Sequence, residues 1–326
     1  MRYVAYERCG GPEVLVVAQT QAPAPAPGEV QIAVEAAGIS RADVLQRKGL
    51  YPPPPGASPI LGLDVAGTIS AVGENVDSWR IGDRVCALLS GGGYAQFACA
   101  PVGQVLAIPQ NWSAIESATL PENAFTVFDN LVTRARLQPA ETVLVHGGTS
   151  GIGSMAIAIA RAVGARAIAT AGSPEKCAAC LRIGAFEAID YKREDFVAAV
   201  QRLTGNRGVD VVVDIVGGEY LARDVATLAL DGRIACIATQ GGSAATIDVG
   251  ALLRKRATII GSSLRARTVE QKTAIARALF ERLWPLLPAR DPIFPIVDRV
   301  FSFDEAAEAH RRMEASAHIG KIVLVP

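Results

Sequence analysis

The residues of this chain that are best suited to chemistry lie in a glycine-rich stretch near its middle. Gly147, Ser150 and Gly153 follow a G-x-x-S-x-x-G spacing, directly after the apolar run 143–145. Glycines let backbone N–H groups approach a pyrophosphate, and the N-terminus of a following helix adds partial positive charge. Strand, glycine turn and helix therefore predict a dinucleotide-binding βαβ unit and nicotinamide redox chemistry. The G-x-G-x-x-G fingerprint is not matched, so the turn alone also fits a connection that merely needs small residues.

The sequence that follows alternates between strand-like and helix-like segments six times. The predicted strands are 143–145, 166–171, 187–189, 209–214, 233–238 and 257–261. The predicted helices are 154–163, one that starts at 174, 195–203, 220–228 and 249–254. The run of valines at 209–214 is typical of a fully buried strand. This alternation predicts an α/β domain with a doubly wound parallel sheet.

The residues after the second predicted strand indicate which nicotinamide cofactor is preferred. NAD-preferring sites usually place an acidic residue there to bind the ribose 2′-hydroxyl, whereas this chain reads Gly-Ser-Pro-Glu-Lys from 172 to 176. Ser173 can donate to a 2′-phosphate, Lys176 can pair with it, and Tyr191 can lie against the adenosine. We therefore predict NADPH as the cofactor. The alternative is that Lys176 is one more solvated helix lysine.

Composition excludes several functional classes. Lys plus Arg and Asp plus Glu number 32 each, so no charge imbalance points to nucleic acid or to an anionic membrane. The first six residues predict a strand rather than a signal peptide, and no apolar stretch is long enough to span a bilayer. The six scattered cysteines fit a reducing compartment, and the C-x-x-C at 177–180 is interpreted as packing within a helix. We expect a soluble, cytoplasmic protein.

Residues 1–120 are rich in proline and glycine and carry short strand-like runs. These runs are 29–36, 64–72, 84–88, 93–98 and 104–108. They predict a small, mostly antiparallel barrel, and strand-like runs at 296–303 and 319–325 around a helix at 304–315 return the chain to it. We therefore predict a discontinuous domain of residues 1–120 and 263–326, and a nucleotide-binding domain of residues 121–262. The substrate is expected between the two domains, where ligand sites are common.

Several motifs spread over the chain carry a resemblance to a known family. They are Ser40-Arg-Ala-Asp43, the stretch 46–56, Leu61-Gly-Leu-Asp-Val-Ala-Gly67, Gly91-Gly-Gly-Tyr-Ala-Gln96, Leu120-Pro-Glu122 and His318-Ile-Gly-Lys-Ile-Val323. Together they resemble the quinone oxidoreductase branch of the medium-chain dehydrogenase/reductase superfamily, over essentially the whole chain. The resemblance implies a Rossmann domain plus a GroES-like catalytic domain, NADPH as cofactor, and reduction of quinones, especially ortho-quinones, or of activated alkenes.

A site without zinc is also expected. Zinc members of the superfamily carry a Cys and a His-Glu pair as catalytic ligands, but Gly62, Leu63 and Asp64 stand where the pair would be. The chain has no quartet of closely spaced cysteines. Its three histidines, at positions 146, 310 and 318, lack ligand spacing.

Two residues are candidates for catalysis. Without zinc the acceptor must already be electrophilic, and the protein must hold donor and acceptor in register. Tyr51 precedes four prolines that stiffen its surroundings. Its phenol either donates a hydrogen bond or proton to the oxyanion that develops on the acceptor, or its ring only packs against the substrate. Ser150, in the glycine turn, is expected to face the pyrophosphate or the nicotinamide.

The cofactor contacts are predicted from the resemblance and from the carboxyl ends of the strands. They are Ser40, Glu122, Thr126, Gly147, Ser150, Gly151, Ile152, Gly153, Gly172, Ser173, Lys176, Tyr191, Gly217, Gln240, Gly241, Gly242, Ser263, Leu264 and Lys321. Three alternatives stay open: Glu122 as a helix N-terminal acid, Gly241 and Gly242 as a plain turn, and Lys321 as a surface lysine. Ser40 replaces the asparagine that is usual in the family, which puts the orientation of the substrate in doubt.

Two other functions compete with quinone reduction. One is an NADPH-dependent enoyl or alkene reductase on the same scaffold. The other is a protein that binds NADPH with little turnover, as a sensor, structural or RNA-binding protein, although the neutral charge weighs against RNA. The apolar strand 257–261 lies at a sheet edge in this fold, so we expect a homodimer that pairs through it.

Overall fold

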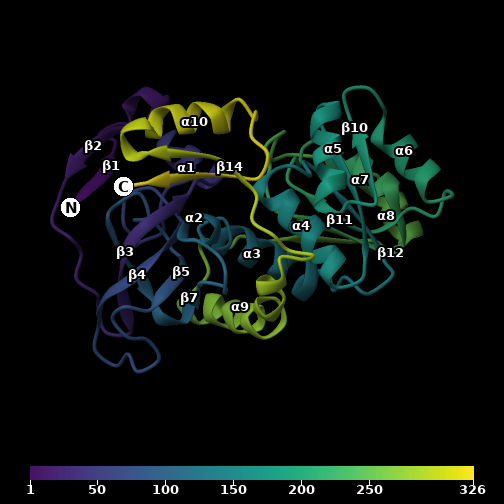
Figure 1. Cartoon of the computed structure of the whole chain (residues 1–326). Coiled ribbons are helices and arrows are strands. Elements are labelled where there is room, and N and C mark those ends of the chain that lie inside the picture. The colour runs from purple at the N-terminus through teal and green to yellow at the C-terminus, as the bar shows by residue number, and fades with distance from the viewer. The chain divides into compact units, whose positions relative to one another are not determined.

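The computed structural model describes residues 1–326, and the chain divides into two compact units. Unit 1 comprises Met1–Phe125, Leu264–Arg290 and Pro295–Pro326, and unit 2 comprises Thr126–Ser263 and Asp291–Phe294. Figure 1 labels their elements. Each unit has its own sheet.

Unit 2 is built on a parallel sheet of six strands in the order β10-β9-β8-β11-β12-β13. The strands are β8 (Thr142–Val145), β9 (Arg166–Ala171), β10 (Glu187–Asp190), β11 (Val209–Asp214), β12 (Leu228–Cys236) and β13 (Thr258–Gly261). The chain starts at β8, adds β9 and β10 on one side, and then adds β11 to β13 on the other. This order confirms the predicted doubly wound sheet, in which ligands bind where the strand order reverses.

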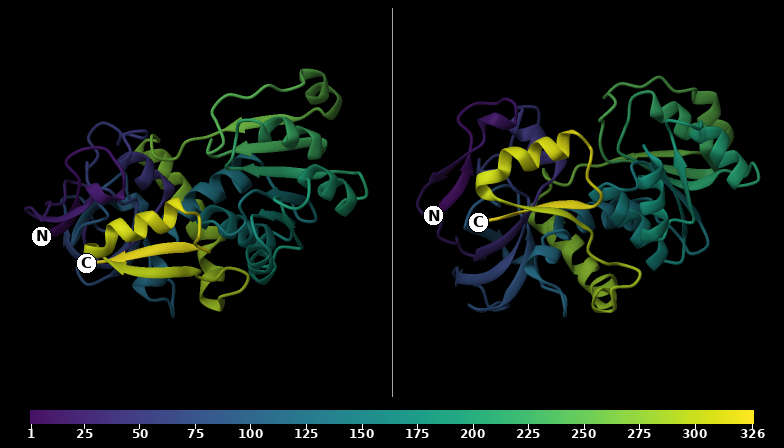
Figure 2. Two further views of the ribbon diagram at one scale, coloured as in Figure 1. Left: turned by 90° about the horizontal axis from the view of Figure 1, so that it is seen from above. Right: turned by 45° about the horizontal axis from the view of Figure 1, so that its top comes forward.

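Helices connect these strands. They are α4 (Gly151–Ala162), α5 (Pro174–Ile183), α6 (Phe196–Leu203), α7 (Tyr220–Thr227) and α8 (Val249–Lys255). Right-handed crossovers place α4 and α5 on one face and the other three on the opposite face, because the two halves add strands in opposite directions. Figure 2 shows the strands of this sheet side by side with helices along them.

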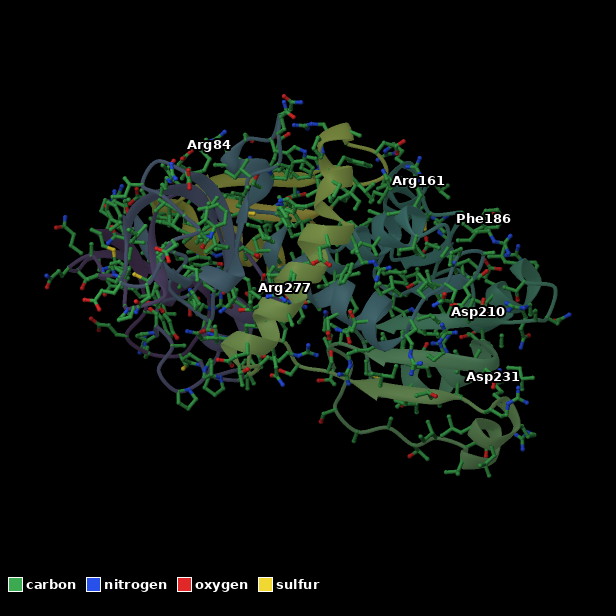
Figure 3. The ribbon with its side chains drawn as sticks, turned by 90° about the horizontal axis from the view of Figure 1, so that it is seen from below. Arg84, Arg161, Phe186, Asp210, Asp231 and Arg277 are labelled. Atoms are coloured by element: carbon green, nitrogen blue, oxygen red, sulfur yellow. The ribbon has the colours of Figure 1, made fainter.

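In unit 2, charged side chains as well as apolar packing hold neighbouring strands of the sheet together. Asp210 in β11 (labelled in Figure 3) accepts the Thr142 N–H at 2.8 Å and pairs with Arg207 at 2.6 Å. Behind them, Leu144, Ile168 and other side chains of the sheet pack in one apolar cluster with the helices. Burial alone favours a protonated Asp210, but the Arg207 guanidinium and the Thr142 N–H outweigh it and lower the pKa of this carboxyl.

Some predicted bounds in unit 2 are wrong. Helix α4 begins at Gly151 rather than at 154, because the Ser150 hydroxyl caps it by accepting the Gly153 N–H at 2.9 Å. Strand β12 begins at Leu228 and ends at Cys236, whereas the prediction was 233–238. Its early start follows from pairing of Leu228 with the first residue of β11 across a register shift.

Unit 1 contains a seven-stranded sheet with the order β14-β15-β3-β4-β5-β7, in which β6 pairs with β3, and a separate hairpin of β1 and β2. The strands are β1 (Arg2–Ala5), β2 (Val16–Gln19), β3 (Glu29–Gly38), β4 (Asp64–Val72), β5 (Arg84–Leu88), β6 (Phe97–Pro101), β7 (Val105–Ala107), β14 (Val297–Ser302) and β15 (Lys321–Val325). Only β14 and β15 pair in parallel. The C-terminal strands thus complete a mostly antiparallel sheet, as predicted, although β6 starts four residues after the predicted 93.

Helices of unit 1 cover this sheet at several places. They are α1 (Arg41–Arg47), α2 (Ala114–Ser117), α9 (Val269–Arg282), α10 (Ala306–Glu314) and the short 3-10 turns η1 (Pro12–Val14), η2 (Val102–Gln104), η4 (Trp284–Ala289) and η5 (Phe303–Glu305). Helix α3 (Pro121–Val127) leads into a π-helical segment, η3 (Phe128–Arg134), in the part of the chain that enters unit 2. Figure 2 shows α10 alongside the strand pair β14 and β15.

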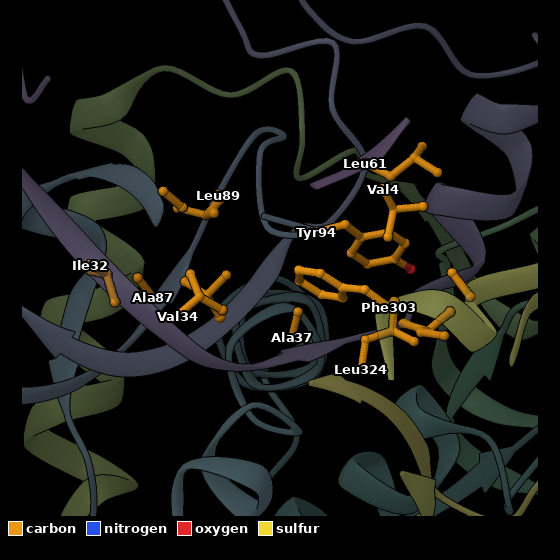
Figure 4. Close-up of a cluster of buried hydrophobic side chains, with 14 of the residues drawn as sticks. Val4, Ile32, Val34, Ala37, Leu61, Ala87, Leu89, Tyr94, Phe303 and Leu324 are labelled. Carbon is orange, nitrogen blue, oxygen red and sulfur yellow. The ribbon is translucent and has the colours of Figure 1, made fainter. Parts of the chain in front are cut away.

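The apolar core of unit 1 borders a group of buried polar side chains. Figure 4 shows Tyr94 among apolar side chains such as Val4 and Phe303. Its hydroxyl lies 3.2 Å from Asp43 Oδ2 and 3.3 Å from His310 Nε2, as a buried phenol requires. Apolar packing therefore leads directly to a group of buried ionisable residues.

Two glycines of unit 2 test how tightly the glycine turn is packed. A Cβ added to Gly153 would lie 2.2 Å from Gly147 O, whereas a Cβ on Gly261 meets nothing within 4 Å. We expect Gly153→Ala to lower the free energy of unfolding by about 1–3 kcal/mol, because the backbone of the turn must move. Gly261→Ala, the control, is expected to stay within about 0.5 kcal/mol of the parent in urea unfolding. Equal stability of both variants would contradict the close approach.

Candidate active site

Four polar side chains meet in the interior of unit 1. Ser40, Asp64, Glu122 and Lys321 form what we call the lysine–carboxylate cluster. Ser40 is the N-cap of α1, Asp64 opens β4, Glu122 lies in the first turn of α3, and Lys321 opens β15. Strand register brings them together, because Gly38 at the end of β3 pairs with Asp64 on one side and with β15 on the other.

The contacts of this cluster centre on the lysine. Lys321 Nζ lies 2.7 Å from Asp64 Oδ2, 2.8 Å from Ser40 Oγ and 3.5 Å from Glu122 Oε2. Ser40 Oγ lies 3.2 Å from both carboxylates, and the Glu122 N–H donates to Asp64 Oδ1. The Asp64 and Lys321 side chains are 0% and 4% exposed, whereas the Glu122 side chain is 19% exposed. Glu122 is therefore the member of the cluster that reaches solvent.

Burial and mutual charge set the protonation of the cluster. Burial opposes the charge of Lys321, but the carboxylates of Asp64 and Glu122 outweigh it and raise the pKa of the amine. Burial first, and then the Asp64 charge, raise the pKa of Glu122 despite the nearby ammonium. Two carboxylates that share one cation in a buried site favour keeping a proton on one of them.

Asp43 connects this cluster to the group of buried polar side chains that borders the apolar core. Its Oδ2 accepts the Ser40 N–H at 2.7 Å and its Oδ1 accepts the Gly62 N–H at 2.9 Å. Burial raises the pKa of Asp43 to about 6, against the lowering effect of these two hydrogen bonds. Burial also lowers the pKa of His310, which faces the same Tyr94 hydroxyl, to about 3, so its imidazole is neutral at pH 7.

Tyr51, a predicted catalytic residue, follows α1 and lies against the buried side chain of Arg265. The Arg265 guanidinium lies 5.4 Å from the centre of the Tyr51 ring and donates to Tyr51 O at 3.3 Å. Lys272 in α9 donates to Ser90 Oγ at 2.8 Å and to Arg265 O at 3.1 Å. Burial lowers the pKa of both cations, that of Lys272 to about 8. Arg265 thus holds the Tyr51 backbone, while no hydrogen bond within the chain engages the phenol hydroxyl.

In unit 2 the predicted glycine turn connects β8 to α4 and is tied to β9. The Gly147 N–H donates to Thr170 Oγ1 at 3.3 Å, and the Gly148 N–H donates to Thr170 O at 2.9 Å. Gly147 has a φ of +66°, which favours glycine. With Ser150 as N-cap, the first turn of α4, at Gly151, presents the helix N-terminus that a pyrophosphate requires.

A buried histidine supports this turn from behind. His146 Nε2 lies 2.7 Å from Asp224 Oδ1 in α7, and His146 Nδ1 lies 3.1 Å from Thr170 Oγ1. The rings of Phe196 and Tyr220 meet the imidazole edge-on at 4.8 and 5.0 Å. Burial raises the pKa of Asp224, although its hydrogen bond to His146 works against this. The histidine is thus a packed support of the turn.

The predicted adenosine-end residues gather at the carboxyl ends of β9 and β10. Ser173 caps α5 by accepting the Lys176 N–H at 3.3 Å, and its hydroxyl also hydrogen-bonds the Glu175 carboxylate. The Tyr191 hydroxyl lies so close to Gly172 that an added Cβ would be 2.8 Å from it. The four predicted cofactor contacts at this end therefore lie together in unit 2: Gly172, Ser173, Lys176 and Tyr191.

The remaining predicted residues are distributed over both units. Gly217 pairs with Gly242, and the Gly241 N–H donates to Val216 O at 2.7 Å, so the loops after β11 and β12 meet there, beside Gln240. Their glycines therefore serve a close backbone approach. Ile152 lies in the first turn of α4, and Thr126, whose carbonyl accepts the Asn130 amide, is the first residue of unit 2. Ser263 and Leu264 stand on either side of the division between the units in the chain.

Sequence reasoning missed part of the site. Asp64 was noted only as a replacement for a metal ligand, yet a carboxylate at the start of an otherwise apolar strand signals a buried partner. Lys272 belongs to α9, whose N-terminus carries a Thr268–Gln271 capping box that predicts a helix. The possibility that Lys321 is a surface lysine is wrong, because the residue is only 3% exposed.

The residues present do not fit a catalytic zinc ion. Asp64 is paired with Lys321, and Gly62 and Leu63 beside it offer no ligand side chain. No three or more His, Cys, Asp or Glu side chains are grouped as metal ligands. Separately, no helix combines the length and the apolar character that crossing a membrane requires.

Comparison with known proteins places these features in context. Residues 26–110 match the family of alcohol dehydrogenase GroES-like domains, and residues 151–279 match the zinc-binding dehydrogenase family. The chain is similar to the quinone oxidoreductase of Rattus norvegicus, with 32% identity over 331 residues that cover 100% of this chain and 98% of the relative.

Two solved structures share this fold over nearly the whole chain. The CurK enoyl reductase has a TM-score of 0.87 at 30% identity and covers 99% of this chain and 98% of that one. A mycobacterial protein complexed with NADPH has a TM-score of 0.88 at 29% identity, with 100% of both chains covered. The likeness to known relatives thus extends over the whole chain.

The buried ion pair of the cluster predicts a large stability effect. Asp64→Asn leaves the Lys321 ammonium without its nearest carboxylate, and we expect a loss of about 3–5 kcal/mol in the free energy of unfolding. Asp304→Asn, which removes an exposed pair with Arg2, is the control and is expected to cost less than about 1 kcal/mol. Urea unfolding monitored by fluorescence measures both. An Asp64→Asn protein as stable as the control would show that the cluster contributes little.

Proposed function

Because the chain belongs to the quinone oxidoreductase branch of the medium-chain dehydrogenase/reductase superfamily, we propose that it is an NADPH-dependent, zinc-independent quinone reductase. The observation that carries this proposal is the full-length similarity to quinone oxidoreductases. Ortho-quinones are the preferred acceptors in this proposal. The coarser conclusion, an oxidoreductase of this superfamily, holds independently of the acceptor.

The proposed cofactor fits groups in unit 2. The anchored turn Gly147–Gly153 would hold the pyrophosphate, since its Thr170 contacts fix the backbone and a capped helix N-terminus follows. Ser173 and Lys176 would bind the 2′-phosphate, and Tyr191 would lie against the adenosine. NADPH, when bound, supplies a hydride. The similarity to a mycobacterial protein complexed with NADPH supports this assignment.

The proposed acceptor class follows from the absence of zinc ligands among the residues of the site. Without a Lewis acid to polarise a carbonyl, the acceptor must be activated by its own conjugation, as quinones and enones are. Tyr51 is the proposed contact for the acceptor, because its backbone is fixed by Arg265 and its phenol hydroxyl is not engaged within the chain. A fixed aromatic donor can orient the acceptor and stabilise the oxyanion.

An alkene acceptor is the second candidate. It is favoured by the similarity to the CurK enoyl reductase, at 30% identity over 99% of this chain. The two activities use the same hydride and differ in the acceptor alone. In either case the proposed assembly is a homodimer paired through β13, which is an edge strand of its sheet.

The proposed activity is tested by the loss of NADPH absorbance with three acceptors, an ortho-quinone, a para-quinone and an enone. We expect turnover with the quinones, fastest with the ortho-quinone, and no effect of a chelator, since no residue group of the site fits a metal. Turnover on the enone alone would move the assignment to alkene reduction. Binding of NADPH without turnover on any acceptor would contradict an enzymatic role and favour a binding protein.

Lys176 tests the preference for NADPH. Lys176→Ala removes the ammonium group and is expected to raise the Kd of NADPH by about 10- to 100-fold, because a hydrogen bond to a charged group contributes about that much to affinity. The Kd of NADH is expected to stay nearly unchanged. Arg182→Ala, in the last turn of the same helix, is the control. Fluorescence titration of both cofactors measures the effect. Equal losses for NADPH and NADH would exclude Lys176 from the 2′-phosphate site.

A further inference from the structure

The hydroxyl group of Ser40 has more partners than one hydrogen can serve. Its Oγ lies 2.8 Å from Lys321 Nζ and 3.2 Å from both Asp64 Oδ2 and Glu122 Oε2. A hydroxyl offers one O–H donor and two acceptor lone pairs. If Lys321 donates to one lone pair and the O–H donates to Asp64, the contact with Glu122 is satisfied when Glu122 carries a proton and donates it to the second lone pair.

The charges of the cluster lead to the same location for that proton. Asp64 makes the closest approach to the ammonium, at 2.7 Å from its Oδ2, and its Oδ1 accepts the Glu122 N–H. Glu122 Oε2 is farther from the ammonium, at 3.5 Å. The geometry therefore assigns the proton of the cluster to Glu122, the carboxyl group farther from the ammonium.

Glu122 is also the member of the cluster from which a proton can leave. Its side chain is 19% exposed, whereas those of Asp64 and Lys321 are 0% and 4% exposed. A proton on Glu122 is therefore in contact with both solvent and the buried network. Burial and the Asp64 charge raise the pKa of Glu122, which favours the protonated form of its carboxyl group.

We propose that Glu122 is the general acid of the reaction and donates the proton that the acceptor requires once it has received a hydride. This inference rests on the proposed function, because it needs a reductive reaction. NADPH, one acceptor and one proton give NADP⁺ and the reduced acceptor. The acceptor gains a bond to hydrogen with the electron pair of the hydride, and its negatively charged oxygen takes the proton of Glu122. The Glu122 carboxylate then regains a proton from solvent.

Ser40 and Lys321 act as positioning residues for this acid. The Ser40 hydroxyl accepts from protonated Glu122, and Lys321 stabilises the carboxylate that remains after transfer. The short side chain of Ser40 is suited to this position, because its oxygen reaches both carboxylates. The serine that stands at a usual asparagine position thus has a function in this chain.

The titratable groups that face Glu122 come from several elements. Asp64 on β4 and Lys321 on β15 contact its carboxyl group, and Asp43 on α1 is linked to it through Ser40. Burial and the Asp64 charge also raise the pKa of the Cys86 thiol on β5. Because the acid must be protonated, kcat is expected to be flat at low pH and to fall as the pH rises through the raised pKa of Glu122.

The kinetic test uses Glu122→Gln in the whole chain. The amide retains the size of the side chain and can donate to Ser40, but it has no proton to transfer. We expect kcat to fall about 10²- to 10⁴-fold and its decrease with rising pH to disappear. Glu116→Gln, which changes a carboxylate paired with Arg290 in unit 1, is the matched control and is expected to keep kcat and the pH profile.

A second readout needs neither cofactor nor acceptor. The infrared difference spectrum between the parent and Glu122→Gln proteins at neutral pH is expected to show the carbonyl band of a protonated carboxyl group. The difference for Glu116→Gln is expected to lack it, since the Arg290 hydrogen bond lowers the pKa of Glu116 to about 2. Should Glu122→Gln fail to fold, Glu122→Asp, which keeps a carboxyl group, is expected to retain the pH dependence and part of kcat.

Three results would overturn the inference. The first is an unchanged kcat and pH profile in Glu122→Gln. The second is a pH dependence that Tyr51→Phe abolishes and Glu122→Gln retains. The third is an infrared difference spectrum without the band of a protonated carboxyl group. A parent protein that turns over neither quinone nor enone would instead overturn the proposed function. The infrared band separates the two failures, because the protonation of Glu122 is measured without any reaction.

Discussion

The buried ammonium group of Lys321 is the constraint on which the rest of unit 1 depends. The Lys321 side chain is only 4% exposed, and a charge buried to that extent must be paired. Its pairing brings together the first residue of β15, the first residue of β4 and the first turn of α3. The last strand of the chain, β15, is thereby joined to β4 and α3 from the N-terminal part of the sequence. The pairing also places two carboxylates around one cation, an excess that favours a proton on one of them.

In unit 2, buried neutral and charged groups surround the glycine turn and hold its backbone in place. Thr170 accepts hydrogen bonds from two backbone N–H groups of the glycine turn, and His146, which is paired with Asp224, contacts the Thr170 hydroxyl. This support lies next to the point where the strand order of the sheet reverses. Each unit thus has buried polar residues at the ends of its strands.

The sequence was sufficient for elements with strong periodic patterns and for motifs contained in one segment. The valine run of β11 and the serine-capped glycine turn are examples, because local residues determine them. The lysine–carboxylate cluster was not predictable as a group, since Ser40 and Lys321 are 281 positions apart and meet only through strand register. Sequence alone left Lys321 open between a cofactor contact and a surface residue, and its burial at the start of β15 excludes the surface alternative. Helix α9 was missed although its capping box was present.

The central claim is that proton transfer from the cluster is coupled to hydride transfer in this chain. Single-turnover reduction of an ortho-quinone by the NADPH-loaded protein, compared in H₂O and D₂O, tests it most directly. A slower turnover in D₂O for the parent protein, with no such difference for Glu122→Gln, is the result predicted here. Equal rates in the two solvents for the parent would contradict the claim, because the proton would then move outside the step that limits turnover.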